Sequence, residues 1–107
     1  MAQTESSSEY NGWTNYETWC VNLWLNNEES TYNYWREAAG EAREASKVED
    51  RFGLTRSPAG LLADRLRDEL QELAYDQVKQ GTLCADLLNG AMSSVDWQEV
   101  ADAFLEE

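Results

Sequence analysis

The fold is decided by the stretch at residues 57–81, SPAGLLADRLRDELQELAYDQVKQG. Ser57 can accept a hydrogen bond from a free N–H group at a helix start, and Pro58 suits the first helical position because proline has no N–H to satisfy. Apolar residues then recur every three or four positions, as on the buried face of a helix: Leu62, Leu66, Leu70 (or Leu73) and Ala74. Gly81 follows Lys79 in the way that helices commonly end, so this stretch predicts one long helix that ends at Gly81.

Upstream, residues 14–27 (TNYETWCVNLWLNN) predict another helix. Thr14 is its expected N-cap, because Glu17 lies three residues later and completes a capping box. The periodicity places five residues on one face: Tyr16, Trp19, Cys20, Leu23 and Asn27. Three apolar residues lie off that face: Val21, Trp24 and Leu25. We therefore expect this helix to be contacted on more than one side, with a Trp-rich strand as the alternative.

Residues 31–47 (TYNYWREAAGEAREASK) predict a second helix, with Ser30 as its N-cap. Its apolar positions again step by three or four: Tyr32, Trp35, Ala39, Ala42 and Ala45. The small alanine side chains should allow another helix to pack closely. Residues 48–56 have mixed charge and are expected to form the loop to the long helix.

Two shorter helices are expected downstream. Residues 82–90 (TLCADLLNG) carry three apolar positions: Leu83, Leu87 and Leu88. Ser93 or Ser94 should open the last helix, whose apolar residues follow helical spacing: Trp97, Val100, Ala101, Phe104 and Leu105. The expected fold is all-α: a compact bundle of four to five helices in a single domain at residues 13–107. A polar, Ser-rich stretch at residues 1–12 should be a short flexible, disordered tail.

The composition argues against an enzyme. The chain of 107 residues is 42% hydrophobic, which suffices for one core, and it contains no histidine. Imidazole is thus absent as general base and as zinc ligand. Cys20 and Cys84 could act as nucleophiles only beside an activating base or cation, and none is apparent, so both are expected to be free, buried thiols. No calcium-loop pattern occurs, and we expect neither metal nor cofactor.

The charge is strongly negative: 21 acidic residues stand against 8 basic ones, for a formal net charge of −13. Such a polyanion should repel phosphates and anionic lipids, so we expect no direct nucleic-acid or membrane binding and a basic protein partner. No apolar run approaches the roughly 20 residues that span a bilayer. The expected location is the cytoplasm, that of the host cell if the chain is phage-encoded.

The acids of the long helix form a row. Asp64, Asp68, Glu72 and Asp76 are spaced four apart, with Glu69 beside them. Successive members rise about 6 Å and rotate about 40°, so the row winds slowly along the helix. Phosphates along one DNA strand are spaced by roughly 6 to 7 Å, and the row could therefore imitate them. Glu99, Asp102 and Glu106 form a second acidic side on the last helix.

Two plainer explanations of the acidity remain open. The row could be the solvated face of an amphipathic helix, with Arg65 and Arg67 near enough to offset part of its charge. Alternatively, an acidic surface could serve solubility or adaptation to concentrated salt. In residues 31–47 the acids alternate with Arg and Lys and largely cancel, which favours the C-terminal half as the anionic side.

Aromatic residues are the second unusual feature. Eight of the twelve lie within residues 10–35, interleaved with asparagines. Packing in the core is the favoured explanation, since a small bundle needs bulky side chains. Trp13 and Tyr34 lie off the best faces and are expected to be exposed for contact with a partner. A sugar or small-ligand site built from Trp and Asn is a further alternative.

The sequence also resembles a family. The matching features are the string TNYETW at residues 14–19, Leu23-Trp24, Tyr34-Trp35, the Leu-Ala-Asp segment at 62–64 and VDWQEVA at 95–101. With these features the chain resembles small uncharacterised acidic proteins with an NYETW motif from phages, plasmids and other mobile elements. The resemblance covers nearly all of the chain after residue 12 and implies a genomic setting but no activity.

That setting favours an anti-defence function. Mobile elements encode small acidic proteins that resemble DNA mimics, and the analogy concerns charge and size. We therefore expect an anti-CRISPR or anti-restriction inhibitor whose two acidic rows occupy the basic nucleic-acid channel of a host defence complex and block DNA binding. The alternative is a non-catalytic protein-interaction or regulatory module that uses its aromatic N-terminal half.

Overall fold

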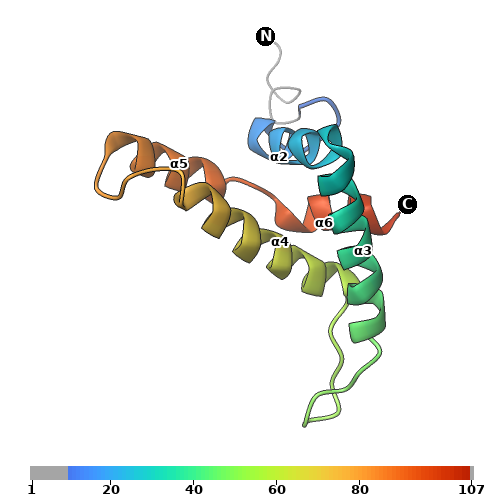
Figure 1. Ribbon diagram of the computed structural model, residues 1–107. Coiled ribbons are helices and arrows are strands. Elements are labelled where there is room, and N and C mark those ends of the chain that lie inside the picture. Colours follow the sequence, from blue (N-terminus) through green and yellow to red (C-terminus); the bar gives the residue numbers. More distant parts are fainter. Residues whose placement is uncertain (1–9, 107) are drawn as a thin grey trace.

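The computed structural model describes residues 10–106 and contains five helices there, with no β-strand among them (Figure 1). In chain order they are α2 (Tyr16–Asn27), α3 (Glu29–Ala45), α4 (Pro58–Tyr75), α5 (Leu83–Ser93) and α6 (Trp97–Leu105). The predicted all-α fold is confirmed. The part of the predicted tail at residues 1–9 lies outside the described residues.

The long central helix α4 begins as predicted. The Ser57 side chain accepts a hydrogen bond from the backbone N–H of Gly60, and Pro58 occupies the first turn. The helix ends at Tyr75, earlier than the predicted stop at Gly81. Gly81, whose φ of 78° suits glycine, instead lies in the turn before α5, and the Thr82 hydroxyl caps that helix.

Three predicted N-caps are wrong by one to three residues. Asn15, not Thr14, caps α2, because its Oδ1 accepts from the backbone N–H of Thr18 at 2.9 Å. At α3 the N-cap position belongs to Glu28, which makes no capping bond with its side chain, and Ser30 lies inside the first turn. At α6 the cap is Asp96 rather than either of the two preceding serines, Ser93 and Ser94.

The core lies where α3, α4 and α6 pack together beneath α2. α3 contributes Trp35 and three alanines, and the predicted apolar face of α6 is confirmed, although Ala45 at the end of α3 is exposed. The buried core cluster consists of Leu25, Trp35, Ala38, Ala39, Ala42, Leu62, Ala63, Leu66, Val100, Ala101 and Phe104.

The predicted inner face of α2 is wrong. Its packed residues are Thr18, Val21 and Leu25, which are three and four positions apart, whereas Tyr16 and Leu23 are exposed. Both sides of this helix are apolar, so periodicity alone could not choose between them. Contact with α3 and α6 makes the choice.

Hydrogen bonds tie the start of α2 to the segment around the start of α6, and we call this set the α2–α6 latch. The Thr14 N–H donates to Glu99 Oε1 at 3.1 Å, and Asn15 Nδ2 donates to the carbonyl of Ser94 at 2.7 Å. The backbone N–H of Asp96 donates to the hydroxyl of Thr18, which is fully buried, at 2.9 Å. The latch gives the buried hydroxyl a partner, as burial of a polar group requires.

Two parts of the chain extend away from this core. The end of α4 and α5 form an arm, on which Leu83 and Leu87 of α5 are exposed (Figure 1). The loop between α3 and α4 projects in another direction. The Cα radius of gyration, 15.6 Å, exceeds the roughly 13 Å that is typical of this length. The helices therefore leave apolar surface without an internal partner.

The chain before α2 forms a tight turn. Tyr10 and Trp13 exchange two backbone hydrogen bonds, and Asn11 and Gly12 between them have positive φ. The Tyr10 ring packs against Trp19 with 4.7 Å between ring centroids. Residues 10–12, which the sequence assigns to the tail, therefore lie against α2.

Candidate functional site

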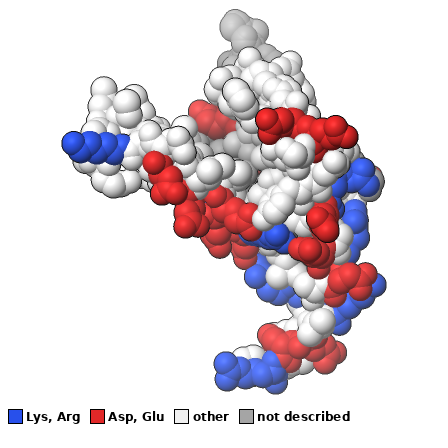
Figure 2. Space-filling model, in the orientation of Figure 1, with Lys and Arg blue, Asp and Glu red and all other residues white. Residues whose placement is uncertain are grey.

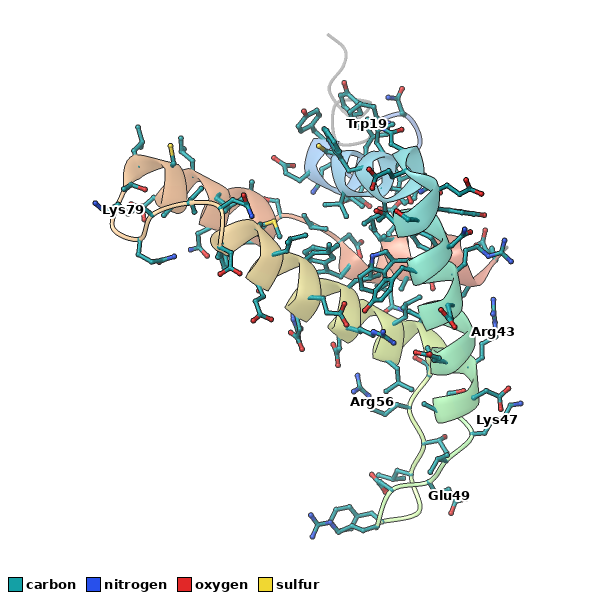
Figure 3. The ribbon with its side chains drawn as sticks, viewed as in Figure 1. Trp19, Arg43, Lys47, Glu49, Arg56 and Lys79 are labelled. Carbon is teal, nitrogen blue, oxygen red and sulfur yellow. The ribbon has the colours of Figure 1, made fainter. Side chains whose placement is uncertain are left out.

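The first acid of the predicted row, Asp64, is held by arginines. Arg56 lies in the loop before α4 (Figure 3) and donates to Asp64 Oδ2 at 2.7 Å, and Arg67 Nη1 lies 3.6 Å from Asp64 Oδ1. The hydrogen bond from Arg56 lowers the pKa of Asp64 below its usual value, against a smaller opposing effect of desolvation. This carboxylate already has its cation, which makes it a poor candidate for a phosphate mimic.

Glu69 is also used within the fold. Its Oε2 accepts from Arg65 Nε at 2.9 Å and its Oε1 from the Tyr34 hydroxyl at 2.8 Å. The same Arg65 bonds Glu41 on α3 at 2.8 Å and lies over the rings of Tyr34 and Trp35. The pKa of Arg65 is raised, and its hydrogen bond to Glu41 is the largest cause. These contacts fasten α4 to α3.

The remaining acids of α4 differ from these two. Asp68 is exposed and bonds its neighbour Arg67 at 3.1 Å. Glu72 and Asp76 are exposed and have no ion pair or side-chain hydrogen bond with any residue from 10 to 106. The predicted row is thus divided: its N-terminal members are paired, and its C-terminal members are available.

The second predicted acidic side, on α6, is divided as well. Glu99 accepts the latch bond from Thr14, whereas the side chains of Asp102 and Glu106 are exposed and unpaired within the described part of the chain. Within residues 10–106, no ion pair or hydrogen bond links the acids of α4 with those of α6. Figure 2 shows the acids of α4 following the arm on one face of the molecule.

Of the cations that were expected to pair with the acids of residues 31–47, Lys47 does so and Arg43 does not. Lys47 pairs with Glu44 at 3.3 Å, as expected. Arg43 instead donates to the carbonyl of Leu105 at 2.6 Å and so joins α3 to the end of α6. Arg43 lies on α3 and Lys47 lies just beyond its end, both away from the arm (Figure 3).

An apolar groove lies between α2, the start of α3 and the C-terminal half of α4. Its volume is about 780 Å³, and Trp24 and Leu73, exposed by 68% and 59%, lie on opposite sides. Leu70 is half-buried at its base, so of the two leucines that the sequence offered for the inner face, Leu70 packs and Leu73 does not. The full lining is Trp24, Leu25, Asn27, Glu28, Ser30, Thr31, Tyr34, Trp35, Glu69, Leu70 and Leu73.

A second hollow of about 440 Å³ continues this surface toward α5. It shares four residues with the first: Trp24, Leu25, Leu70 and Leu73. No Lys or Arg lines either hollow. Figure 2 shows mostly uncharged side chains at the recess between α2 and the arm, with acidic side chains at its edges. We refer to the two hollows together as the α2–α4 groove.

Sequence reasoning identified Tyr34 but missed Trp24. Tyr34 is exposed, as predicted, and lines the groove, although its hydroxyl is already bonded to Glu69. Trp13, the other suspected contact, is half-buried in the turn before α2. The sequence did show that Trp24 lies off the predicted apolar face of α2. From the sequence alone, this position indicates packing against another helix rather than exposure.

The two cysteines differ in their exposure. Cys20 is half-buried and Cys84 is exposed rather than buried, and both thiols are free. The proximity of Cys20 raises the pKa of Tyr16, which makes the phenol a weaker candidate for ionised chemistry. Within residues 10–106 no three acidic or cysteine side chains converge in a way that could hold a metal ion. None of the described helices is long and apolar enough to cross a membrane.

The model of a family of unknown function (DUF7249) matches residues 6–94, most of the chain. No curated protein and no solved structure matches.

Proposed function

The chain belongs to DUF7249, a family of unknown function, and we propose that it is a non-catalytic protein-interaction module that holds a partner in the α2–α4 groove. One observation carries the proposal: Trp24 and Leu73 are both largely exposed and line the same groove. Large apolar side chains that face each other across an open groove are typical of surfaces that a partner covers.

The physical basis is hydrophobic burial at a preformed recess. A tryptophan covered by a partner removes about 150 to 250 Å² of surface from water, and Trp is among the residues that most often dominate binding energy. The recess is held by Tyr34, Arg65 and Glu69, whose mutual hydrogen bonds fix the wall formed by α3 and α4. A rigid wall reduces the ordering cost of binding.

Trp24→Ala tests this proposal, with Phe52→Ala as the matched control. Both residues are exposed aromatics, but Phe52 lies in the loop between α3 and α4, outside the groove. A protein retained from host extract by the wild-type chain should be retained by Phe52→Ala and lost with Trp24→Ala. Equal retention by both variants would contradict a binding function of the groove.

A second candidate function is acidic inhibition of host defence, which the resemblance to mobile-element proteins favours. The observation that supports it is the lack of an ion-pair partner, among the described residues, for Glu72, Asp76, Asp102 and Glu106. In this mechanism the unpaired carboxylates contact Lys and Arg in the nucleic-acid channel of a CRISPR or restriction complex and exclude DNA. The protein would act in the host cytoplasm without binding nucleic acid itself.

Charge reversal tests this second function. Glu72→Lys with Asp76→Lys should weaken inhibition of DNA binding by a restriction enzyme or CRISPR complex, and raised salt should weaken the wild type similarly. Glu37→Lys with Glu49→Lys changes the net charge equally but lies on α3 and in the following loop. Equal loss of inhibition in both double variants would indicate that only total charge matters.

A further inference from the structure

We infer that the occupant of the α2–α4 groove is a basic amphipathic helix of a partner protein. This inference rests on the proposed interaction function and adds the chemistry of the partner. It draws on the shape of the groove, the charges around it and the charge of the chain itself.

The shape favours a helix with one apolar face. The two hollows share Trp24, Leu70 and Leu73, so they form one elongated apolar surface between α2 and α4. An amphipathic helix places apolar side chains at positions i, i+3 or i+4 and i+7, which line up along such a groove. The lining runs from Glu69 on α4 to Gln77 just beyond its end, about 12 Å along the helix axis, so two to three turns of a partner helix would span it.

The charges favour Lys and Arg on the flanks of that helix. Glu28 and Glu69 line the groove, and neither hollow has a cation in its lining. Glu69 is already paired with Arg65, but Glu72 precedes Leu73 on α4 and Asp76 follows one turn later, both unpaired within the described residues. Charge complementarity of this kind steers association and disfavours acidic partners.

The same charges argue against a second copy of this chain as the occupant. Each copy carries a formal charge of −13, and docking would bring two acidic grooves or arms together. Like charges at a contact oppose association, and the apolar contact alone would have to overcome their repulsion. A basic helix gains from both effects.

The test is a display selection of random peptides of about 16 residues on the full chain, followed by affinity measurement with fluorescein-labelled peptides. We expect the enriched peptides to combine apolar residues at helical spacing with a net positive charge. Leu73→Gln should weaken their binding about 30-fold, as at an interface hot spot. Leu87→Gln on α5, an equally exposed leucine outside both hollows, should leave it unchanged.

A charge comparison completes the test. Glu72→Gln with Asp76→Asn should weaken the basic peptides about fivefold at low salt, whereas Glu37→Gln with Glu49→Gln should have little effect. Enriched peptides that are neutral or acidic but sensitive to Leu73→Gln would overturn the inference and leave the interaction function standing. Peptides insensitive to Leu73→Gln would overturn both. A wild-type dimer disrupted by Leu73→Gln in sedimentation would assign the groove to a second copy and overturn the basic-helix inference.

Discussion

The two halves of α4 share one helical pattern but have different surroundings. In the first half, Leu62 and Leu66 are buried against α3 and α6, and Asp64 is paired with arginines. In the second half, Leu73 is exposed, and Glu72 has no ion pair within the described chain. The apolar repeat and the acidic repeat both continue across the helix, so neither repeat determines burial or pairing.

The difference arises from which elements lie opposite each half. The loop and α3 bring Arg56 and Glu41 to the first half, where they form ion pairs with Asp64 and Arg65. The second half faces the groove and α5, and Lys79 beyond its end forms no ion pair with a described residue. The first half is therefore expected to determine stability, and the second half to determine binding.

The largest contrast is expected from leucine truncation in the two halves. Leu66→Ala should lower the free energy of unfolding by about 2 to 5 kcal/mol, because Leu66 is 0% exposed and truncation leaves a cavity. Leu73→Ala should change it by no more than about 0.5 kcal/mol, as at other exposed positions. Urea denaturation monitored by tryptophan fluorescence measures both. Comparable losses would show that the second half is also buried in solution.

A smaller loss of stability is expected when the α2–α6 latch is disrupted. Thr18→Val keeps the shape but removes the hydroxyl that accepts from Asp96 N–H and donates to Asn15 Oδ1. We expect the free energy of unfolding to fall by about 1 to 3 kcal/mol, the cost of leaving buried partners unsatisfied. Thr31→Val, at a hydroxyl that bonds Glu28 on an exposed site, is the control. An equal effect of both variants in urea denaturation would contradict the role of burial.

A pH dependence is expected from Asp64 in the first half. Its pKa is lowered in the folded chain, so its pairing stabilises the fold above the unfolded-state pKa of about 3.9 and is lost as the pH falls through the lower, folded value. Asp64→Asn should cost no more than about 1 kcal/mol at neutral pH, because the site is partly exposed. Thermal unfolding at several pH values should show the two proteins converging in acid. A gap that widens in acid would contradict the assignment.

The smallest effect is expected for the acids of the second half. Glu72→Gln with Asp76→Asn should leave the fold unchanged or stabilise it by about 0.2 to 0.5 kcal/mol, because like charges four residues apart repel each other. Thermal unfolding at low and high salt measures the change, and the gain should shrink as salt screens the repulsion. A clear loss of stability would mean that these carboxylates have partners in solution.

The sequence predicted the helices more reliably than their faces. Ser57 and Pro58 marked the start of α4 because capping is local chemistry, and the inner face of α6 followed from a single clear stripe. On α2, both sides are apolar, and only the positions of α3 and α6 select Thr18 and Leu25 for burial. Periodicity cannot contain that information.

The candidate site was likewise only partly predictable from the sequence. The acids were visible as a row, but Arg56 lies 8 residues from Asp64 in the chain, and Glu41 lies 24 residues from Arg65, so tertiary contact decides which charges are paired. Trp24 is a candidate binding residue because the end of α4 lies opposite it across the groove, which the sequence does not show. The sequence shows which acidic, basic and aromatic residues are present. Which charges form ion pairs and which side chains are exposed depends on the fold.

The α2–α6 latch has a consequence for the order of folding during synthesis. Its bonds join residues 78 to 85 positions apart, so the start of α2 leaves the ribosome long before its partners at the start of α6. At roughly 5 to 20 residues per second, the Thr18 hydroxyl waits several seconds for its bond from Asp96, with only its local bond to Asn15 available. The contacts that α3 makes with α2 and α4 can form first, whereas the latch bonds can form only when the last helix has been made.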